Sequence, residues 1–260
     1  MAKGVQANMI EITSLTNVTV KETVKLQQKK HREETGLFLI EGAKPVEEAI
    51  NNGVEFVRIF LNSSFVLDDV PLGVELIKTN DPVLKKISTT ETAPPVVAVA
   101  KQKQLSGEWL KTAKKVVLFE GIKDAGNLGT VLRTASAFGI DGVILFGETV
   151  DLYNPKCVRS SVGNLWKNNV FKITKFSDLQ KCLEGFVKIG TLPKCENSVY
   201  LNDFTFPEKS CLFFGSEADG LSDELKNFVD TNVTIEMSNS VESLNLGVSA
   251  SIIMYKMRSL

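Results

Sequence analysis

The sequence predicts an α/β protein, and its larger C-terminal part is expected to be a mostly parallel sheet with helices on both faces. Short, almost continuously apolar runs alternate with helical segments, as in VVLFEGI (116–122), DGVILFG (141–147) and CLFFGSE (211–217). Such strands, separated by helices, are typical of parallel sheets that are covered on both sides. A length of 260 residues with 43% hydrophobic and 23% charged residues indicates a folded chain of two domains.

The first block, residues 1–105, reads as a small α/β domain. Its elements in order are a polar helix in 17–35, a strand at 36–42, a helix at 43–53, a strand at 54–62, a helix that begins near 80–82, and a strand at 94–100. Gly53 stands where a helix C-terminal glycine belongs, and Asn80 or Asp81 can cap the helix that carries Pro82 in its first turn. The polar stretch 106–114 is predicted to be a linker.

The second block, residues 115–260, continues the alternation. Between and after the three apolar strands, we expect helices at 127–140, 154–164, 221–229 and 244–258, and strands at 186–192 and 233–237.

Composition excludes several functional classes. The 30 basic and 31 acidic residues give a net charge of −1, which excludes a generally polycationic chain but not a local basic patch. With one histidine, His31, no Ser-His-Asp triad or His-rich zinc site can form unless it supplies the only imidazole. The four cysteines form no CxxC pair, and no signal peptide precedes them, which predicts reduced thiols in a cytoplasmic protein. No apolar run approaches the roughly 18 residues of a membrane span.

Polar and glycine-rich loops follow three of the predicted strands. They are EGIKDAGNLGTVLRTA (120–135), FFGSEADGL (213–221) and MSNSVESLNLG (237–247). Ligands of open parallel sheets lie outside the carboxyl ends of the strands, so these loops predict one cleft for a polar ligand. None of them is GxGxxG or a P-loop, which disfavours a Rossmann-like nucleotide-cofactor oxidoreductase.

Each of the polar residues in these loops can also be explained by an ordinary structural role instead of a functional one. Arg133, in an otherwise apolar and small helical segment, must meet an anion or a carboxylate, and a salt bridge with a neighbouring element is as good a reading as a ligand. Asn127 can cap its helix or orient a ligand, and Glu217 can be a solvated loop carboxylate. Capping accounts fully for Ser243, which with Asn245 begins the last helix.

Taken together, the three loops resemble the signature motifs of the SpoU/TrmH branch of the SPOUT superfamily, which are S-adenosylmethionine-dependent RNA ribose 2′-O-methyltransferases. The matching residues are Asn127, Gly129, Arg133, Thr134 and Ala135; Gly215, Glu217, Gly220 and Leu221; and Ser243, Leu244, Asn245, Val248 and Ile252. Ala218 and Ala125 depart from the family, which usually has Gly and Pro there. The first block resembles the family's small ribosomal-protein-like RNA-binding extension.

The resemblance implies a deep trefoil knot in the catalytic domain, with the chain near 213–250 threaded through a loop. It implies S-adenosylmethionine bound without a metal by Thr191, Leu192, Gly215, Ile235 and Leu244. It also implies a homodimer that completes the active site, with Ile252, Ile253 and Tyr255 partly in the interface.

The resemblance further implies a catalytic set of Arg133, Asn127, Glu217, Ser243 and Asn245, in which the counterpart of Arg133 is the proposed general base. Because an arginine side chain is a difficult base, our hypothesis is that Arg133 mainly grips a phosphate, while the other four residues orient it and the ribose. RNA is expected on the basic helix, whose net charge over 21–32 is +4, through Lys25, Lys29, Lys30 and Arg32. A solvated charged helix is the alternative. Ribosomal RNA is favoured as the substrate; a tRNA 2′-O-methyltransferase and a catalytically inactive RNA-binding paralogue remain the other readings.

Overall fold

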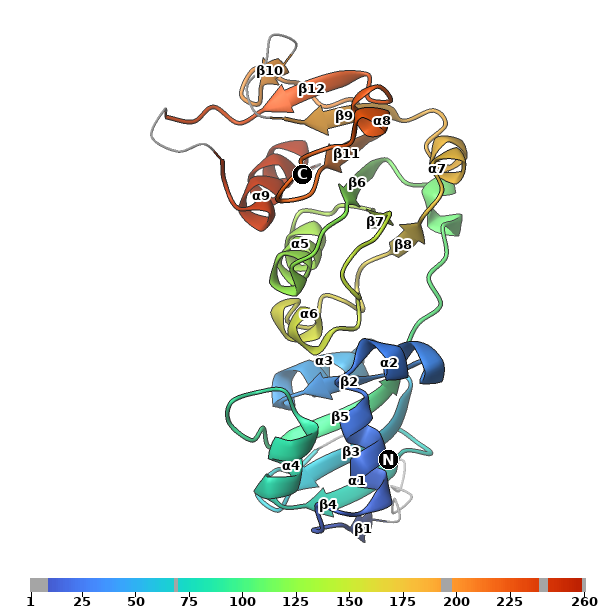
Figure 1. Cartoon of the computed structure of the whole chain (residues 1–260), viewed down its shortest axis with the longest axis vertical. Coiled ribbons are helices and arrows are strands. Elements are labelled where there is room, and N and C mark those ends of the chain that lie inside the picture. Colours follow the sequence, from blue (N-terminus) through green and yellow to red (C-terminus); the bar gives the residue numbers. More distant parts are fainter. Residues whose placement is uncertain (1–8, 68–69, 193–197, 239–242, 259–260) are drawn as a thin grey trace, which may run out of the picture. The chain divides into compact units, whose positions relative to one another are not determined.

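The computed structural model describes residues 9–67, 70–192, 198–238 and 243–258 (Figure 1). The chain divides into two compact units. The first contains Met1–Lys103 and Asp151–Trp166, and the second contains Gln104–Val150 and Lys167–Leu260. The boundary after Lys103 lies close to the predicted one, but residues 151–166, predicted within the 115–260 domain, group with the first unit.

The first unit contains a five-stranded mixed sheet in the order β1-β4-β3-β5-β2. Its strands are β1 (Met9–Glu11), β2 (Leu37–Glu41), β3 (Phe56–Asn62), β4 (Glu75–Thr79) and β5 (Val96–Lys101). Strand β5 pairs antiparallel with β2 and β3, whereas β4 pairs parallel with β1 and β3. The sequence did not predict β1 or β4, which are three and five residues long.

The helices of this unit are α1 (Val18–Lys25), α2 (Lys29–Thr35), α3 (Ala43–Asn51), α4 (Asp81–Ile87) and α6 (Pro155–Ser160). The single helix predicted in 17–35 is therefore two helices. Asn17 caps the first, and Gly36, with φ +67°, ends the second. The predicted cap of α4 is confirmed, because the Asn80 side chain accepts a hydrogen bond from the Val83 N–H. Helices α1 and α4 cover one face of the sheet over Leu39, Phe60, Ile77, Val97 and Val99.

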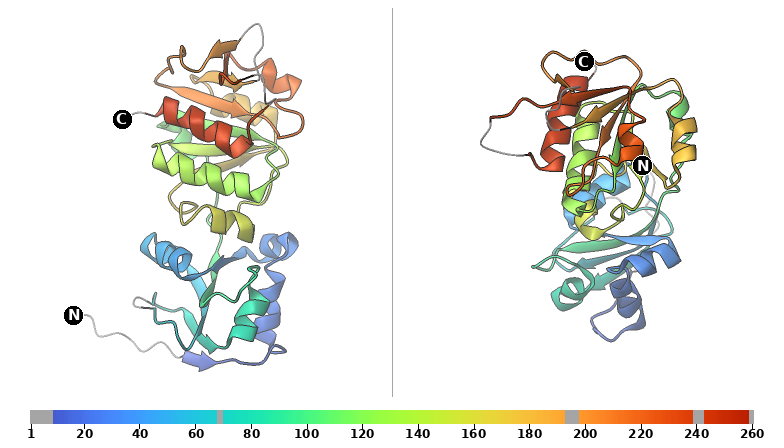
Figure 2. Two further views of the ribbon diagram at one scale, coloured as in Figure 1. Left: turned by 90° about the vertical axis from the view of Figure 1, so that its left-hand side faces the viewer. Right: turned by 45° about the horizontal axis from the view of Figure 1, so that its top comes forward.

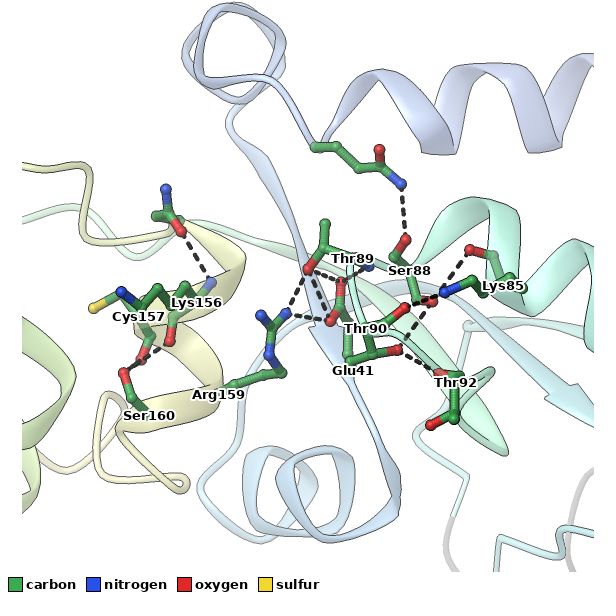
Figure 3. Close-up of polar contacts among 12 residues, drawn as sticks. Glu41, Lys85, Ser88, Thr89, Thr90, Thr92, Lys156, Cys157, Arg159 and Ser160 are labelled. Carbon is green, nitrogen blue, oxygen red and sulfur yellow. Dashed lines mark hydrogen bonds and ion pairs between the residues drawn. The ribbon is translucent and has the colours of Figure 1, made fainter. Parts of the chain in front are cut away.

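The segment 151–166 is joined to the first unit by ion pairs and aromatic contacts. The buried carboxylate of Glu41 accepts from the Arg159 guanidinium at 2.6 Å and from the Thr89 N–H at 2.8 Å (Figure 3). Arg32 Nε donates to Asp151 at 2.7 Å, and the ring of Phe38 lies 4.6 Å from that of Tyr153. A buried ion pair is costly to break, so these contacts hold the segment firmly.

The second unit contains a seven-stranded sheet in the order β10-β12-β9-β11-β6-β7-β8, and every pairing described in it is parallel. This confirms the predicted parallel sheet. The strands are β6 (Lys115–Glu120), β7 (Gly142–Phe146), β8 (Val170–Ile173), β9 (Val187–Thr191), β10 (Ser198–Tyr200), β11 (Ser210–Phe214) and β12 (Thr231–Thr234). Strands β8 and β10 were not predicted.

Helices cover both faces of this sheet. Helices α5 (Ala125–Ala137) and α9 (Leu246–Met257) lie side by side on one face (Figure 2). Helices α7 (Phe176–Cys182), which was not predicted, and α8 (Asp223–Lys226) cover the other, together with a short 3₁₀ helix (Glu108–Lys111). Leu110 and Ala113 are buried in that core, so the predicted linker 106–114 is instead packed into the second unit.

Candidate functional site

Two cavities lie at the carboxyl ends of the parallel strands, and they share a wall made of residues 216–221 and Asn245. The first, about 960 Å³, is lined by the segments that follow β6, β7 and β11. The second, about 670 Å³, is lined by the segments that follow β9, β11 and β12 and by the start of α9. Residues 239–242 of the third predicted loop lie outside the described residues; the described parts of all three loops meet here.

The second cavity collects all five residues predicted to bind a cofactor. Thr191, Leu192, Gly215, Ile235 and Leu244 line it together. The first two are held by the sheet, since the Thr191 hydroxyl donates to the Phe213 carbonyl at 2.9 Å and the Leu192 N–H donates to the Val233 carbonyl at 3.2 Å. The cavity lies within the size range of sites for small ligands.

The wall between the cavities is a closed loop, residues 215–221. The Ser216 N–H donates to the Gly220 carbonyl at 3.0 Å, and the Gly220 N–H donates to the Ser216 carbonyl at 3.1 Å. Gly215 lies directly under the end of this loop, where a Cβ would stand 1.9 Å from the Gly220 carbonyl carbon. Gly220 has φ +69°, whereas Ala218 has no positive φ, so Ala in place of the family's Gly needs no strained backbone.

Asn127 and Glu217 meet at the first cavity. The Asn127 side-chain amide donates to Glu217 Oε1 at 3.0 Å across 90 positions of sequence. Asn127 is not the helix cap, because Asp124 caps α5 and accepts from the Asn127 N–H at 2.8 Å. Asn127 sits in the first turn, where its side chain is free to reach the loop. The fold therefore brings this pair of predicted site residues together at the first cavity.

The start of α9 lies close to the start of α5. Asn245 caps α9 by accepting from the Gly247 N–H at 2.9 Å and the Val248 N–H at 3.3 Å, so the cap predicted for Ser243 is supplied by Asn245. Ser243 is exposed and lines the second cavity. A Cβ on Gly247 would stand 3.4 Å from Asn127 Oδ1, which shows how closely the two helix ends approach.

Arg133 is the exception among the predicted catalytic residues. It is exposed on α5 and lines neither of the two cavities, and its side chain forms no hydrogen bond or ion pair with the residues that the structure describes. The alternative in which Arg133 forms a salt bridge with a neighbouring element is therefore not seen among the described residues, and its side chain remains available to an anion. The apolar residues near it in sequence, Val131, Leu132 and Ala135, are buried.

Helix α9 also carries an exposed apolar stripe. Val248, Ile252 and Tyr255 are 47%, 38% and 53% exposed, and the Tyr255 ring contacts that of Phe138. Three α9 residues were predicted to lie partly in an interface. For Ile253 this prediction is wrong, because the residue is 2% exposed and packs in the core.

The positive charge of the predicted RNA-binding helix is partly neutralised by glutamates close by in the sequence. Lys25, Lys29 and Lys30 are exposed, but each pairs with a glutamate on the same segment. Extending the count to 21–35 lowers the net charge to +2. Arg32 is 2% exposed and bonds to Asp151 and to the carbonyls of 26 and 27, so it cannot contact RNA and its predicted role is wrong.

Four carboxylates that line the first cavity were not predicted: Glu120, Asp124, Glu148 and Asp219. Glu120, the last residue of β6, accepts from the Ser222 N–H at 2.7 Å. Asp124 is the N-cap of α5. An aspartate three residues before a backbone N–H of the first helical turn, here that of Asn127, is the sequence signal that could have indicated this cap. Despite the acidic lining, no group of three or more His, Cys, Asp or Glu within the described ranges is arranged to hold a metal ion. None of the helices described is long and apolar enough to cross a membrane.

Comparisons with known proteins agree with this arrangement. A family model described as the SpoU rRNA Methylase family matches residues 114–255, and one described as an MRM3-like substrate binding domain matches residues 17–98. The 23S rRNA (guanosine(2553)-2′-O)-methyltransferase RlmP of Bacillus subtilis is 32% identical over 253 residues, covering 96% of this chain and 100% of the relative. The 23S rRNA (uridine(2479)-2′-O)-methyltransferase of Streptomyces viridochromogenes is 28% identical over 247 residues, with 89% and 85% covered.

Solved structures are similar over almost the whole chain. The AdoMet-bound rRNA methyltransferase from Sinorhizobium meliloti superposes with a TM-score of 0.84 at 26% identity, covering 95% of this chain and 97% of that one. The SpoU methyltransferase AviRb from Streptomyces viridochromogenes, in complex with AdoMet, gives 0.83 at 27% identity, with 92% and 96% covered. Both the domain matches and the full-length relatives show that the chain belongs to the SpoU rRNA methylase family.

Proposed function

We propose that this protein transfers a methyl group from S-adenosylmethionine (AdoMet) to a ribose 2′-hydroxyl of ribosomal RNA. The observation that carries the proposal is the shared wall: loop 215–221 borders both the cavity of the five predicted cofactor residues and the cavity of the Asn127–Glu217 pair. A donor and an acceptor on the two sides of one loop would have their reacting atoms close together.

The second cavity suits AdoMet. Leu192, Ile235 and Leu244 offer apolar surface for an adenine ring, and Gly215 leaves backbone exposed beside them. When bound, AdoMet supplies a methyl group on a sulfonium that is already activated, so the protein need only orient the acceptor. The 2′-hydroxyl is a weak nucleophile, and the protein must place it and favour the loss of its proton.

The first cavity would hold the target ribose. Glu217 accepts the Asn127 amide through Oε1, which leaves its other oxygen for a ribose hydroxyl. Asn245 stands at the positive end of α9, and the N-terminus of α5 lies beside it, so the two helix dipoles offset part of the negative charge of the acidic lining of this cavity.

Arg133 would complete the site from a second copy of the chain. Its exposure on α5, outside both cavities, and the exposed Val248, Ile252 and Tyr255 on the adjacent α9 support a homodimer that brings Arg133 of one protomer to the cavities of the other. A guanidinium can grip a phosphate through two parallel hydrogen bonds and stabilise a developing alkoxide, whereas its pKa is too high for a general base.

Three further features are part of the proposal. The segments that follow β9, β11 and β12 gather around one cavity, which supports the trefoil knot implied for residues 213–250. Lys25, Lys29 and Lys30 remain exposed on α1 and α2, inside the segment that matches a substrate binding domain, and support RNA contact. The free thiols of Cys182 and Cys211 support a cytoplasmic location.

The test is methyl transfer with defined RNAs. The purified protein is incubated with AdoMet labelled in its methyl group and with either unmodified ribosomal RNA or unmodified tRNA, and an Asn127→Ala variant serves as the control. Label in ribosomal RNA that is lost in the variant supports the proposal. Label in tRNA alone favours the tRNA enzyme, and RNA binding without label favours the inactive paralogue.

A further inference from the structure

Glu120 holds the loop that separates the two cavities. It is the last residue of β6, it lines the first cavity, and its Oε2 accepts from the backbone N–H of Ser222 at 2.7 Å. Ser222 follows directly on loop 215–221 and caps α8 through its own side chain. We infer that Glu120 is a positioning residue for methyl transfer, which acts by fixing the exit of this loop. The inference rests on the function proposed above.

The entry and exit of the loop lie together. Gly215, at the entry, lies against the backbone of Gly220 and Leu221, and the two hydrogen bonds between Ser216 and Gly220 close the ring. Leu221 is 1% exposed and buried in the core. The bond from Ser222 to Glu120 therefore fixes the loop where it leaves the closed ring.

The tip of the loop is held to the same segment of chain. Asn127, seven residues after Glu120, donates to Glu217 at 3.0 Å. Loop 215–221 thus has two connections to the β6–α5 segment, one at its exit and one near its tip. Gly121, next to Glu120, lies close to the loop as well, since a Cβ there would stand 3.7 Å from Ser216 Cβ.

The position of this loop affects both substrates. Residues 216–221 line the cavity of the Asn127–Glu217 pair and the cavity of the predicted cofactor residues. Loss of the Glu120 connection would let the loop shift without unfolding the core beneath it. A shift of about 1 Å in a positioned group is enough to reduce turnover by roughly 100-fold.

The hydrogen bond and the negative charge of Glu120 can be separated by substitution. Glu120→Gln keeps an oxygen that accepts from the Ser222 N–H, whereas Glu120→Ala removes the acceptor. Glu224→Gln is the matched control, because it removes one negative charge from exposed α8, two residues beyond Ser222, and Glu224 lines neither cavity. The readouts are AdoMet affinity by calorimetry, kcat and KM with ribosomal RNA, and thermal unfolding.

We expect Glu120→Ala to weaken AdoMet binding and lower kcat, each by roughly 10- to 100-fold, while Glu120→Gln and Glu224→Gln stay within about threefold of wild type. Impairment of Glu120→Gln equal to that of the alanine variant would overturn the inference, because the charge rather than the bond would then matter. Wild-type kinetics in Glu120→Ala would also overturn it. If the alanine variant does not fold, the kinetics of Glu120→Gln and Glu224→Gln are compared instead. A Glu120→Gln enzyme that is much slower than Glu224→Gln would then overturn the inference.

Hydrogen exchange gives a readout that does not depend on activity. Amides of residues 215–222 should exchange faster in Glu120→Ala than in wild type and should be unchanged in Glu120→Gln. Faster exchange in a protein that methylates no RNA would refute the proposed function and leave the loop connection intact. Unchanged exchange in an active Glu120→Ala enzyme would refute the connection alone.

Discussion

Replacing Gly215 with alanine tests the geometry of the site, because the added methyl group would meet backbone rather than a movable side chain. The new Cβ would stand 1.9 Å from the Gly220 carbonyl carbon and 2.2 Å from the Leu221 nitrogen. Ordinary contact begins at 3.4 Å, so the backbone of loop 215–221 must move by about 1.5 Å. Overpacking of this kind costs roughly 1–3 kcal/mol, which corresponds to a 5- to 150-fold loss of affinity if the shift is borne by the loop.

Gly220→Ala is the matched control in the same loop. A Cβ there meets nothing within 4 Å, so the loop need not move, although φ of +69° is unfavourable for alanine by about 1 kcal/mol. AdoMet binding by calorimetry and denaturant unfolding are measured for both variants. Gly215→Ala should lose affinity for AdoMet beyond its loss of stability, and Gly220→Ala should lose stability mainly. Wild-type affinity in a folded Gly215→Ala variant would refute the packing argument.

Three other changes have defined outcomes. Arg133→Lys keeps the charge but not the two parallel hydrogen bonds, so kcat should fall by roughly 10- to 100-fold in a transfer assay; near-wild-type turnover would reject bidentate phosphate binding. Neutralising Lys25, Lys29 and Lys30 together should reduce the slope of log affinity against log salt by about 2, and an unchanged slope would exclude this surface from the RNA interface. Burial raises the pKa of Tyr153 to about 12 from 10.0, so the folded state keeps a proton that the unfolded state loses above pH 10, and stability should fall as the pH rises from 10 to 12. Chemical unfolding should show a smaller loss over that range in Tyr153→Phe, and equal losses would contradict the assignment.

Much of the catalytic unit could be predicted because its signals are local. Apolar runs fixed β6, β7 and β11 to within a few residues, and the polar loops that follow them meet at one edge as parallel topology requires. The cofactor residues could be predicted only from the family motifs, since apolar side chains such as those of Ile235 and Leu244 do not by themselves indicate a ligand site. The pairing of Asn127 with Glu217 spans 90 positions and became visible only in the fold.

The missed features depend on distant partners or on short elements. Arg32 belongs to a basic run, and nothing near it in the sequence shows that Asp151, 119 positions later, buries it as an ion pair. Strands β1 and β10 contain three residues each, too few for a periodic signal. The 106–114 stretch is polar by count, but Trp109 and Leu110 supply enough apolar surface to pack it into the core.

Alkaline hydrolysis of the methylated RNA tests the proposed reaction at the level of the atom that is modified. Alkali cleaves RNA through the free 2′-hydroxyl, so a 2′-O-methyl group protects the bond that follows it. After incubation of the protein with methyl-labelled AdoMet and ribosomal RNA, complete hydrolysis should leave the label in alkali-resistant dinucleotides. Label recovered in mononucleotides would place the methyl group on a base and contradict ribose 2′-O-methylation.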